Sequence, residues 1–250
     1  MKLSVIMPVY NRERYVVSAL RSLVRQRDAA NLDIIVIDDG STDASAEIVR
    51  SMIGENSCIR LFQQAHMGVA KARNAGLRQL PPDAEFVSFL DSDDISLPGR
   101  FKTDLARFDG HPELELTYSL MTVTDQLDDK TLEPAVGSRT VTLRGISLTT
   151  ALFSRELIER VGYFDEEFEQ SEDTDYLLRV FELGPNCEML DSVAIYYRRH
   201  GGNITSEHGT RVRDHLRAIH KSMRRRKANP ALHGVQGIFD LKNLPQWLTM

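Results

Sequence analysis

The order of apolar and polar residues along the first hundred positions predicts alternating strands and helices. Four short apolar runs have the length of single buried strands: residues 2–8, 32–37, 59–62 and 86–90. Between them, apolar side chains recur every three or four positions, which predicts helices over residues 15–23, 44–52 and 69–80. Because repeated strand–helix units pack into an open sheet, we expect an α/β fold with a Rossmann-like, mainly parallel sheet flanked by helices.

The second half of the chain is less regular, and we expect an α+β arrangement there. The patterns predict strands and helices in turn: strands at 114–124, 187–190 and 193–199, and helices at 154–160, 172–183 and 211–227. Residues 125–145 follow neither periodicity, so we expect an irregular and mobile excursion in this part of the chain.

These patterns also predict the domain organisation. We expect one main domain over residues 1–228, with a first half over 1–97 and a second half over 98–228. Pro230 would separate this domain from a tail over residues 229–250, whose apolar side chains could dock on a surface.

Polar and acidic residues directly follow several of the predicted strands. Tyr10-Asn11 follows the first strand, Asp38-Asp39 the second, and Asp91-Ser92-Asp93-Asp94 the fourth. Open α/β sheets bind ligands outside the carboxyl ends of their strands, so these side chains are predicted to meet at one edge. The chain has neither a Gly-x-Gly-x-x-Gly motif after its first strand nor a P-loop motif, which argues against an ordinary dinucleotide-binding fold.

The acidic segment Asp91-Ser92-Asp93-Asp94 is the strongest candidate for a metal site. Its carboxylates repel one another unless a cation or strong hydrogen-bond donors lie nearby. Mg²⁺ and Mn²⁺ prefer oxygen ligands and commonly link one or two carboxylates to substrate phosphates. An ion bound there would stabilise negative charge on a departing diphosphate. The alternative is a surface turn in which Asp94 caps the following helix.

Three other positions have both a chemical and a structural interpretation. Asp39 could accept a hydrogen bond from the N3–H group of a uracil ring, or cap the next helix, as Asn11 could cap the first. Within Glu172-Asp173-x-Asp175, a carboxylate could remove the proton of an acceptor hydroxyl, or the acids could stabilise a helix dipole. His200 could join a metal or phosphate site, or be an ordinary loop residue, and the other six histidines show no partner pattern.

Composition excludes several classes of protein. The chain of 250 residues is 42% hydrophobic and 27% charged, and no run approaches the roughly 18–20 apolar residues of a membrane span. Cys58 and Cys187 lie far apart and form no pair motif, as in proteins of a reducing compartment, so we expect a cytoplasmic protein. The net charge of −5 argues against a broad nucleic-acid-binding face.

Positive charge is concentrated in one segment, from Arg211 to Lys227. It has eight Lys or Arg residues and a single acid, Asp214. This segment would make peripheral contact with an anionic membrane surface, or it is the solvated face of a helix.

Five motifs follow one another in a fixed order: Ser4-Val5-Ile6-Met7-Pro8-Val9-Tyr10-Asn11, Ile37-Asp38-Asp39-Gly40-Ser41-Thr42-Asp43, Gly68-Val69-Ala70-Lys71-Ala72-Arg73-Asn74, Leu90-Asp91-Ser92-Asp93-Asp94, and Gly162-Tyr163-Phe164-Asp165 leading to Glu172-Asp173-Thr174-Asp175. Over roughly residues 1–205, their order and spacing resemble the family 2 inverting glycosyltransferases, which have the GT-A fold. Any one motif is weak, whereas all five together are highly specific. The resemblance implies an enzyme of glycan or cell-envelope biosynthesis that moves a sugar from a UDP-sugar to an acceptor hydroxyl with Mg²⁺ or Mn²⁺.

The resemblance also implies a role for each matching residue. Tyr10 would stack on the uracil base and Asp39 would pair with it, while Asp91 and Ser92 approach the ribose and sugar. The implied donor-binding set is Pro8, Val9, Tyr10, Asn11, Asp39, Gly68, Lys71, Arg73, Asp91 and Ser92. Asp93 would be the direct metal ligand, with Asp91 and His200 able to join it. Asp173 would be the general base.

Two features of the family pattern are missing or unassigned. The Gln-x-x-Arg-Trp motif of processive polysaccharide synthases is absent, so we expect non-processive transfer. Residues 125–150 match no motif, which leaves the acceptor open among a glycan, a lipid-linked molecule and a protein. The oligomeric state is also open.

Two alternatives remain on a related fold. A sugar-1-phosphate nucleotidylyltransferase would have a Gly-rich loop with Arg or Lys after the first strand, where this chain has Pro8-Val9-Tyr10-Asn11. A non-catalytic nucleotide-sugar-binding protein would be expected to lack an acid from one cluster, but Asp91, Asp93 and Asp173 are all present.

Overall fold

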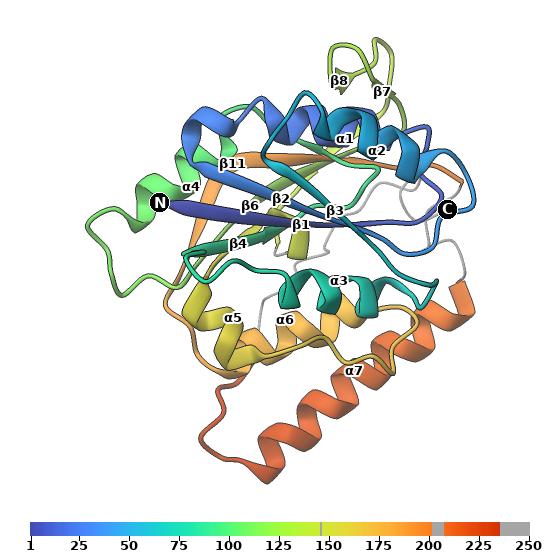
Figure 1. Cartoon of the computed structure of the whole chain (residues 1–250). Helices are drawn as coiled ribbons and strands as arrows, with labels where there is room; N and C mark the ends of the chain where they lie inside the picture. The colour runs from blue at the N-terminus through green and yellow to red at the C-terminus, as the bar shows by residue number, and fades with distance from the viewer. Residues whose placement is uncertain (146, 202–207, 236–250) are drawn as a thin grey trace.

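Nine strands form one mixed sheet in the computed structural model, which describes residues 1–145, 147–201 and 208–235 (Figure 1). Their order is β3-β2-β1-β4-β10-β6-β11-β5, and β9 pairs with β6. The sheet is flanked by helices on both faces, as the sequence predicts. Among the described residues, no helix has the length and apolar character needed to cross a membrane.

The parallel half of the sheet is built from the first hundred residues. Its strands are β1 (Lys2–Val9), β2 (Asn31–Asp38), β3 (Ile59–Gln63) and β4 (Phe86–Phe89), all parallel to their neighbours in this half. The connecting helices are α1 (Val16–Val24), α2 (Ser45–Ile53) and α3 (Val69–Arg78), with the short 3-10 helix η1 (Arg27–Ala29) after α1. The alternation of side chains explains the layers, because Leu3, Val5 and Met7 pack with α1 whereas Ile6 packs with α3 on the other face. These elements confirm the predictions for this half.

The second half of the sheet joins the first through β10 (Ala151–Ser154), which is antiparallel to both β4 and β6. The other strands are β5 (Ile95–Ser96), β6 (Leu116–Thr124), β9 (Thr140–Leu143) and β11 (Cys187–Arg198). Neither β5 nor β10 is predicted by the sequence pattern, since each is too short to show a period. The two strands expected near Leu190 and Val193 are one strand, β11, with a register shift between these residues.

The expectation of an irregular excursion over residues 125–145 is wrong in part, and its expected mobility stays a prediction. This segment forms a two-stranded hairpin and the edge strand β9, and the hairpin strands are β7 (Leu127–Asp128) and β8 (Glu133–Pro134). Pairing with β6 explains the order, because β9 satisfies backbone groups that would otherwise remain at the sheet edge. Strands of two to four residues are too short to show a periodic pattern of apolar residues in the sequence.

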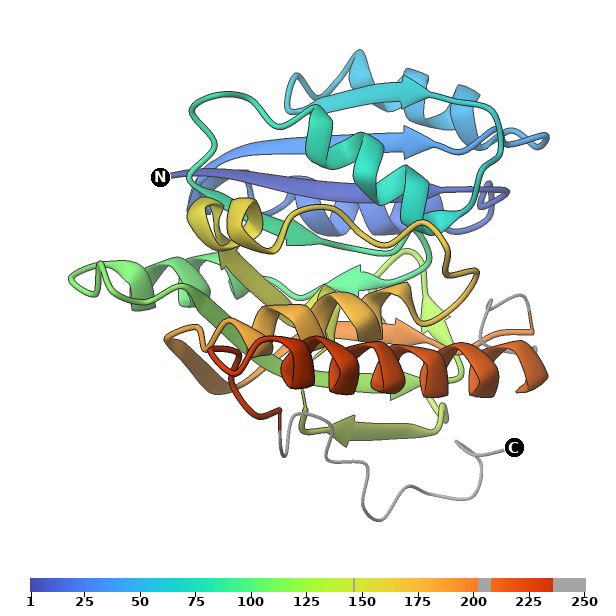
Figure 2. The same ribbon diagram turned by 90° about the horizontal axis from the view of Figure 1, so that it is seen from below.

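The remaining helices cover the second half. They are α4 (Arg100–Phe108), η2 (Leu148–Thr150), α5 (Arg155–Val161), α6 (Glu172–Glu182) and α7 (His208–Ala228). Figures 1 and 2 show α3, α5, α6 and α7 on one side of the sheet, with α7 outermost against α6. Both cysteines, Cys58 and Cys187, are unpaired and half-buried.

Two expected helix caps are absent. The residue at the start of α1 is Tyr15, whereas Asn11 adopts a left-handed conformation with φ 51° and accepts a hydrogen bond from the Thr42 N–H. Asp94 does not cap α4, which begins after Gly99. In both cases the expected capping side chain instead accepts a hydrogen bond from a residue distant in the sequence: Asn11 from Thr42 and Asp94 from Arg198.

The expected tail begins beside α6. The His233 N–H donates to the Glu182 carbonyl at 2.8 Å, so the chain turns back after α7. The apolar tail residues from Ile238 to Leu248 lie outside the described residues, and their expected docking stays a prediction, as does the division at residue 97.

The contact between α3 and β1 leads to a stability prediction. A Cβ at Gly76 would lie 2.4 Å from Cγ2 of Ile6, which is fully buried and β-branched. We expect Gly76→Ala to cost about 1–3 kcal/mol of unfolding free energy, which outweighs the ~1 kcal/mol that alanine gains in a helix. Urea denaturation measures the change. Gly54→Ala is the matched control, because its nearest contact would be an ordinary 3.6 Å. An unchanged midpoint of urea denaturation for Gly76→Ala would show that the Ile6 side chain can move away from the added methyl group at no cost.

Candidate functional site

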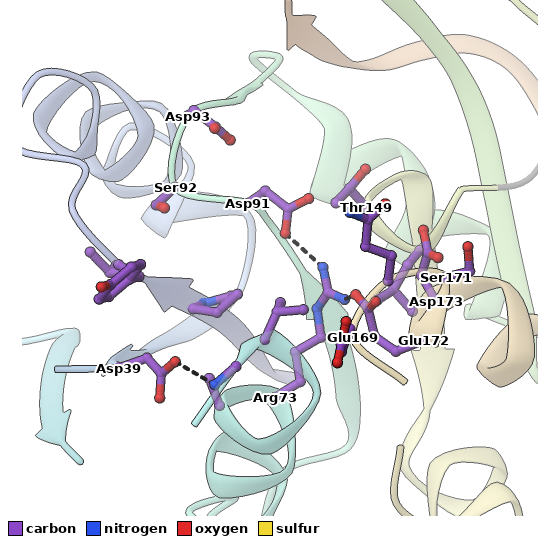
Figure 3. A pocket seen from close by; sticks show the side chains of 18 of the residues that line it. Asp39, Arg73, Asp91, Ser92, Asp93, Thr149, Glu169, Ser171, Glu172 and Asp173 are labelled. Atoms are coloured by element: carbon purple, nitrogen blue, oxygen red, sulfur yellow. Dashed lines mark hydrogen bonds and ion pairs between the residues drawn. The ribbon is translucent and has the colours of Figure 1, made fainter. Parts of the chain in front are cut away.

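A cavity of about 680 Å³ opens where β1, β2 and β4 end and where α6 begins. This is the edge at which open α/β sheets bind ligands. Most of the predicted site residues line it: Pro8, Val9, Tyr10, Asp39, Gly68, Arg73, Asp91, Ser92, Asp93 and Asp173. Figure 3 shows Asp39 on one side of this cavity and Asp173 on the other, with Asp91 between them.

Asp39 organises the loop that follows β3. Its Oδ1 accepts from Gln64 Nε2 at 2.7 Å and from the Met67 N–H at 3.0 Å. Its Oδ2 accepts from the Gly68 N–H at 2.8 Å and lies 2.9 Å from His66 Nδ1. These four partners match the roughly four lone-pair positions of a carboxylate. A base that pairs with Asp39 must therefore take the place of one of them.

Gly40 allows this loop to approach the end of β2. It has φ +75°, and a Cβ there would lie 2.7 Å from the backbone nitrogen of His66. Only glycine adopts this conformation readily while leaving room for the second backbone. The glycine after Asp39 is therefore needed to bring the 64–68 loop to the carboxylate.

Tyr10 lies at the mouth of the cavity. Its ring stacks on His66 with centroids 3.8 Å apart and planes at 14°, and Tyr10 is still 37% exposed. One face is therefore taken by an imidazole, and the ring is accessible enough for a second planar group. His66 was not predicted, because nothing in its sequence neighbourhood shows that it would lie between Tyr10 and Asp39.

Asn11 and Lys71 are the predicted donor-binding residues that do not line the cavity. The Asn11 N–H donates to Ser41 Oγ at 3.0 Å, and its side-chain oxygen accepts from the Thr42 N–H at 2.8 Å. It therefore joins the ends of β1 and β2 behind the cavity. Lys71 is half-buried on α3 and absent from the cavity wall.

Arg73 connects the two halves of the site. It is 4% exposed, and its guanidinium donates to Asp91 at 2.8 Å and to Glu172 on α6 (Figure 3). Burial acts to lower the pKa of Arg73, but the charges of Asp91, Glu172 and Asp173 outweigh it and raise that pKa above its ordinary value. The guanidinium therefore stays charged.

The two acids bound to Arg73 have the opposite tendency to neutralise. Burial raises the pKa of Glu172 to about 7 and raises that of Asp91, although Arg73 acts to lower both. One guanidinium is shared between the buried carboxylate of Glu172 and the carboxylate of Asp91, whose side chain is 34% exposed, so it does not fully compensate either of them. The sequence places Glu172 only in an acidic cluster and gives no sign of its contact with Arg73, 99 residues away.

The acidic segment after β4 is held in place by Arg198 at the end of β11. The Arg198 N–H donates to Asp94 Oδ1 and its Nε donates to the Asp93 carbonyl, both at 3.0 Å. Asp94 is fully buried, and burial together with the charges of Asp93 and Asp91 raises its pKa well above the ordinary value. Asp94 therefore anchors the segment instead of facing a ligand.

Asp93 is the acid best placed to hold a cation. Its Oδ2 lies 3.0 Å from His200 Nε2 and 3.1 Å from Arg12 Nε. Burial acts to raise the pKa of Asp93, but the hydrogen bond from His200 and the charge of Arg12 lower it below its usual value. The carboxylate is thus ionised and lies beside an imidazole nitrogen, so the two side chains could together offer an oxygen and a nitrogen ligand to a metal ion.

The predicted metal ligands are only partly brought together. Asp93 and His200 are adjacent, whereas Asp91 is paired with Arg73. Within the described ranges, no group of three or more His, Cys, Asp or Glu side chains is arranged to hold a metal ion. This pair of donors still fits Mg²⁺ or Mn²⁺, which usually bind through one or two carboxylates and complete their shell with substrate phosphates and water.

Asp173 lies in the first turn of α6 and faces the cavity. Ser171, the residue just before α6, has a left-handed φ of 61°, and this conformation sets the direction in which the helix starts. Asp175 points away, since its carboxylate accepts from Arg179 at 2.9 Å and from Arg225 of α7 at 2.8 Å. The acids of this cluster therefore have different positions: Glu172 and Asp173 belong to the cavity, and Asp175 fixes the helix.

The rest of the wall comes from residues outside the predicted site set, although Val69, Ala72, Glu172 and Thr174 stand inside the sequence motifs. They are Arg12, His66, Val69, Ala72, Ser147, Leu148, Thr149, Glu169, Gln170, Ser171, Glu172, Thr174, Tyr197 and His215. Those from η2, from the loop before α6 and from α7 enclose the side of the cavity near Asp173. No local motif marks these residues of η2, of the loop before α6 and of α7, because they converge from segments far apart in the chain.

The shared ion pair of Arg73 leads to a prediction of energetic coupling. Arg73→Met leaves the buried Glu172 and the partly exposed Asp91 without their cation, and the uncompensated charge of Glu172 leads us to expect about 3–5 kcal/mol of lost stability. Glu172→Gln in the same chain should restore part of this loss, because one of the two orphaned charges is removed. A double-mutant cycle of urea denaturation, without ligand, measures the coupling. Strictly additive effects would contradict a shared ion pair, and Arg78→Met, on the exposed side of α3, is the matched control.

The chain is similar in sequence to known glycosyltransferases. Among curated proteins, the chain is 28% identical to the poly(ribitol-phosphate) beta-N-acetylglucosaminyltransferase TarS of Staphylococcus aureus strain Mu50, over 82% of this chain and 37% of that protein. It is 26% identical to the uncharacterized glycosyltransferase EpsJ of Bacillus subtilis, over 81% of this chain and 62% of that protein. The chain thus spans less than two thirds of the length of these relatives.

Solved structures show the same fold. A crystal structure of S. aureus TarS residues 1–349 in complex with UDP-GlcNAc matches with a TM-score of 0.71 and 25% identity, over 89% of this chain and 65% of that one. The mannosyltransferase PcManGT from Pyrobaculum calidifontis, in complex with GDP-Man and Mn²⁺, matches with a TM-score of 0.67 and 20% identity, over 89% and 64%. The fold is therefore the GT-A fold of glycosyltransferases. The family model described as glycosyl transferase family 2 matches residues 4–162, and the chain belongs to that family.

Proposed function

We propose that this chain is a metal-dependent, inverting glycosyltransferase that moves one sugar from a UDP-sugar to an acceptor hydroxyl. One observation carries the proposal: Asp173 lies across the cavity from the wall formed by Tyr10, Asp39 and Asp91. A site for sugar transfer needs these two sides, one for the donor and one for the proton acceptor. The similarity to TarS, whose structure contains UDP-GlcNAc, supports a uridine nucleotide as the donor.

The donor would lie along the carboxyl ends of β1, β2 and β4. Tyr10 would stack on the base. The edge of the base would form hydrogen bonds with Asp39 and with the groups of the 64–68 loop that surround its carboxylate. Gly68, where α3 starts, would present the positive end of the helix dipole to the diphosphate. Arg73 would hold Asp91 beside the donor sugar.

A divalent cation is part of the proposal. Asp93 and His200 would hold Mg²⁺ or Mn²⁺, and Asp91 could join if it left Arg73. When bound, such an ion would neutralise the charge that develops on the departing UDP. PcManGT, which contains Mn²⁺ with its sugar nucleotide, supports this on the level of the shared fold.

Asp173 would supply the base. Its carboxylate would take the proton of the acceptor hydroxyl, the hydroxyl oxygen would form the new bond to the anomeric carbon, and the bond to the UDP oxygen would break on the opposite side. One displacement of this kind inverts the anomeric configuration. The ion pair of Arg73 with Glu172 holds the first turn of α6 and so keeps the neighbouring Asp173 directed into the cavity.

Two alternatives have weaker support. A sugar-1-phosphate nucleotidylyltransferase needs a Gly-rich cationic loop after β1, and this chain has a turn through Tyr10 and Asn11 instead. A protein that binds a sugar nucleotide without turnover has no need for a base, whereas Asp173 lines the same cavity as Asp91 and Asp93. The chain lacks the Gln-x-x-Arg-Trp motif of processive polysaccharide synthases, and we therefore propose non-processive transfer.

The assignment of the base gives a direct test. Asp173→Asn keeps the size of the side chain and removes its basicity, so we expect turnover of a UDP-sugar to fall by about 10²–10⁴-fold. Binding of UDP should change little, because Asp173 lies on the other side of the cavity. UDP release from a panel of UDP-sugars measures turnover without a known acceptor, and calorimetry measures UDP binding. Asp109→Asn, an exposed acid at the end of α4, is the matched control. Normal turnover by Asp173→Asn would exclude this residue as the base.

The metal site gives a separate test. Asp93→Asn removes the charged ligand, and we expect Mn²⁺ affinity in the presence of UDP to fall by more than about 10²-fold. Chelation by EDTA should abolish sugar transfer by the native chain, and added Mn²⁺ or Mg²⁺ should restore it. Electron paramagnetic resonance of bound Mn²⁺ measures affinity independently of activity. Unchanged Mn²⁺ binding by Asp93→Asn would place the ion elsewhere.

A further inference from the structure

Helix α7 has two different sides. One side packs on α6: Asp214, Ala218 and Ser222 are buried, and Arg225 donates to Asp175 at 2.8 Å and to Glu182 at 2.7 Å. The opposite side is the outermost surface of this part of the molecule (Figure 2). Since no other described element packs there, any function of this side concerns something outside the chain's own core.

The outward side carries a line of large apolar residues. Val212, Leu216, Ile219 and Met223 are 46%, 61%, 38% and 58% exposed. Their spacing of four, three and four residues places them in one row along the helix, which we call the outer row. Four of the nine large hydrophobic side chains that are exposed in the described residues lie in this row. Such a concentration marks an interaction surface more than chance exposure.

The charges beside the outer row have a single sign. At 100° per residue, Arg213, His220, Arg224 and Lys227 lie along one edge and Arg226 along the other, and Arg213 pairs with the exposed Glu169 of the loop before α6. The only acid of α7 is Asp214, which is buried on the inner side and paired with Arg213. An apolar row between cations, with no acid on its face, is the pattern of a helix that lies in the surface of an anionic membrane.

The structure also shows which of the basic residues are available. Arg217 pairs with Glu167 at 2.6 Å, Lys221 pairs with Asp165, and Arg225 pairs with the acids of α6. Arg224 and Lys227 are exposed and have no ion pair among the described residues. The charge of the segment is therefore divided: Arg213 and the inner cations pair with acids of the domain, whereas Arg224 and Lys227 remain for a partner.

We propose that the outer row of α7 binds the surface of an anionic lipid bilayer. A bilayer supplies both complements at once, hydrocarbon for Leu216 and Met223 and negative charge for Arg224 and Lys227. A second copy of the chain would instead bring like charges together around the twofold axis. The tail from residue 236 onward contains one acid, Asp240, and one base, Lys242, and so offers no net negative charge.

Attachment through this face would orient the cavity. His215, adjacent to Leu216, lines the cavity on the side of Asp173, and Asp214 accepts from the Gln170 N–H at 3.1 Å. If the proposed function holds, the acceptor side of the cavity is thus brought to the lipid surface. The membrane contact itself does not depend on catalysis and is tested separately.

Flotation with vesicles tests the contact on the full chain. We expect binding to vesicles of phosphatidylcholine with 30% phosphatidylglycerol at low salt, little binding to pure phosphatidylcholine, and release at high salt. Leu216→Glu with Met223→Glu, and separately Arg224→Glu with Lys227→Glu, should each reduce the bound fraction at least roughly tenfold. Val136→Glu, fully exposed in the turn after β8, and Lys102→Glu, exposed on α4, are the matched controls and should bind as the native chain does.

Each outcome shows whether a lipid bilayer or a second copy of the chain binds the outer row. No flotation at low salt, or equal flotation with neutral vesicles, overturns the proposal. A dimer in sedimentation velocity that Leu216→Glu dissociates, without vesicle binding, would assign the row to a second copy. Thermal unfolding confirms that the variants fold, and UDP-sugar hydrolysis without vesicles is measured in parallel. Lost flotation with normal hydrolysis in the native chain refutes only the membrane contact, and lost hydrolysis with normal flotation refutes only the proposed function.

Discussion

The ion pair network of Arg73 is the constraint on which the site depends. A guanidinium that is 4% exposed must have anionic partners, and the buried carboxylate of Glu172 must have a cation, while Asp91, whose side chain is 34% exposed, adds the second anion. Asp91 follows β4 in the parallel half, and Glu172 opens α6 in the second half. The three side chains satisfy one another only when both halves are folded against each other. The same contact that closes the domain therefore sets the distance across the cavity.

This constraint reaches the proposed base through one helical turn. Glu172 and Asp173 are neighbours, so fixing one carboxylate to Arg73 directs the other into the cavity. Asp175, on the far side of the turn, is held by Arg225 of α7, which prevents α6 from rotating about its axis. The three acids of one short cluster thus have separate tasks. A helix held on two sides is the rigid support that a catalytic group needs.

The sequence predicted what depends on local order and missed what depends on distant pairing. The strands β1 to β4 show apolar runs long enough to read, and the acids after β4 were found because parallel strands end at a common edge. Strands β5 and β10 have two and four residues, and their pairing with β11, β4 and β6 leaves no local trace. His66 and Arg12 were missed for the same reason. Each is defined by a carboxylate more than twenty residues away, and only three-dimensional proximity brings them together.

Arg12 and His66 also explain how so acidic a cavity exists before any ligand binds. Asp93 is balanced by Arg12 and His200, and Asp39 is saturated by the 64–68 loop. Bare carboxylates in this space would raise one another's pKa and take up protons, as Asp94 tends to do. With its resident partners Asp93 stays ionised. Under the proposed function a metal and a nucleotide would bind by exchange, because each arriving cation or donor group would replace one already present. Exchange costs less than the creation of new charge in a buried site, and it favours ligands that bring both a cation and hydrogen-bond donors. A sugar nucleotide with its metal ion is a ligand of that kind.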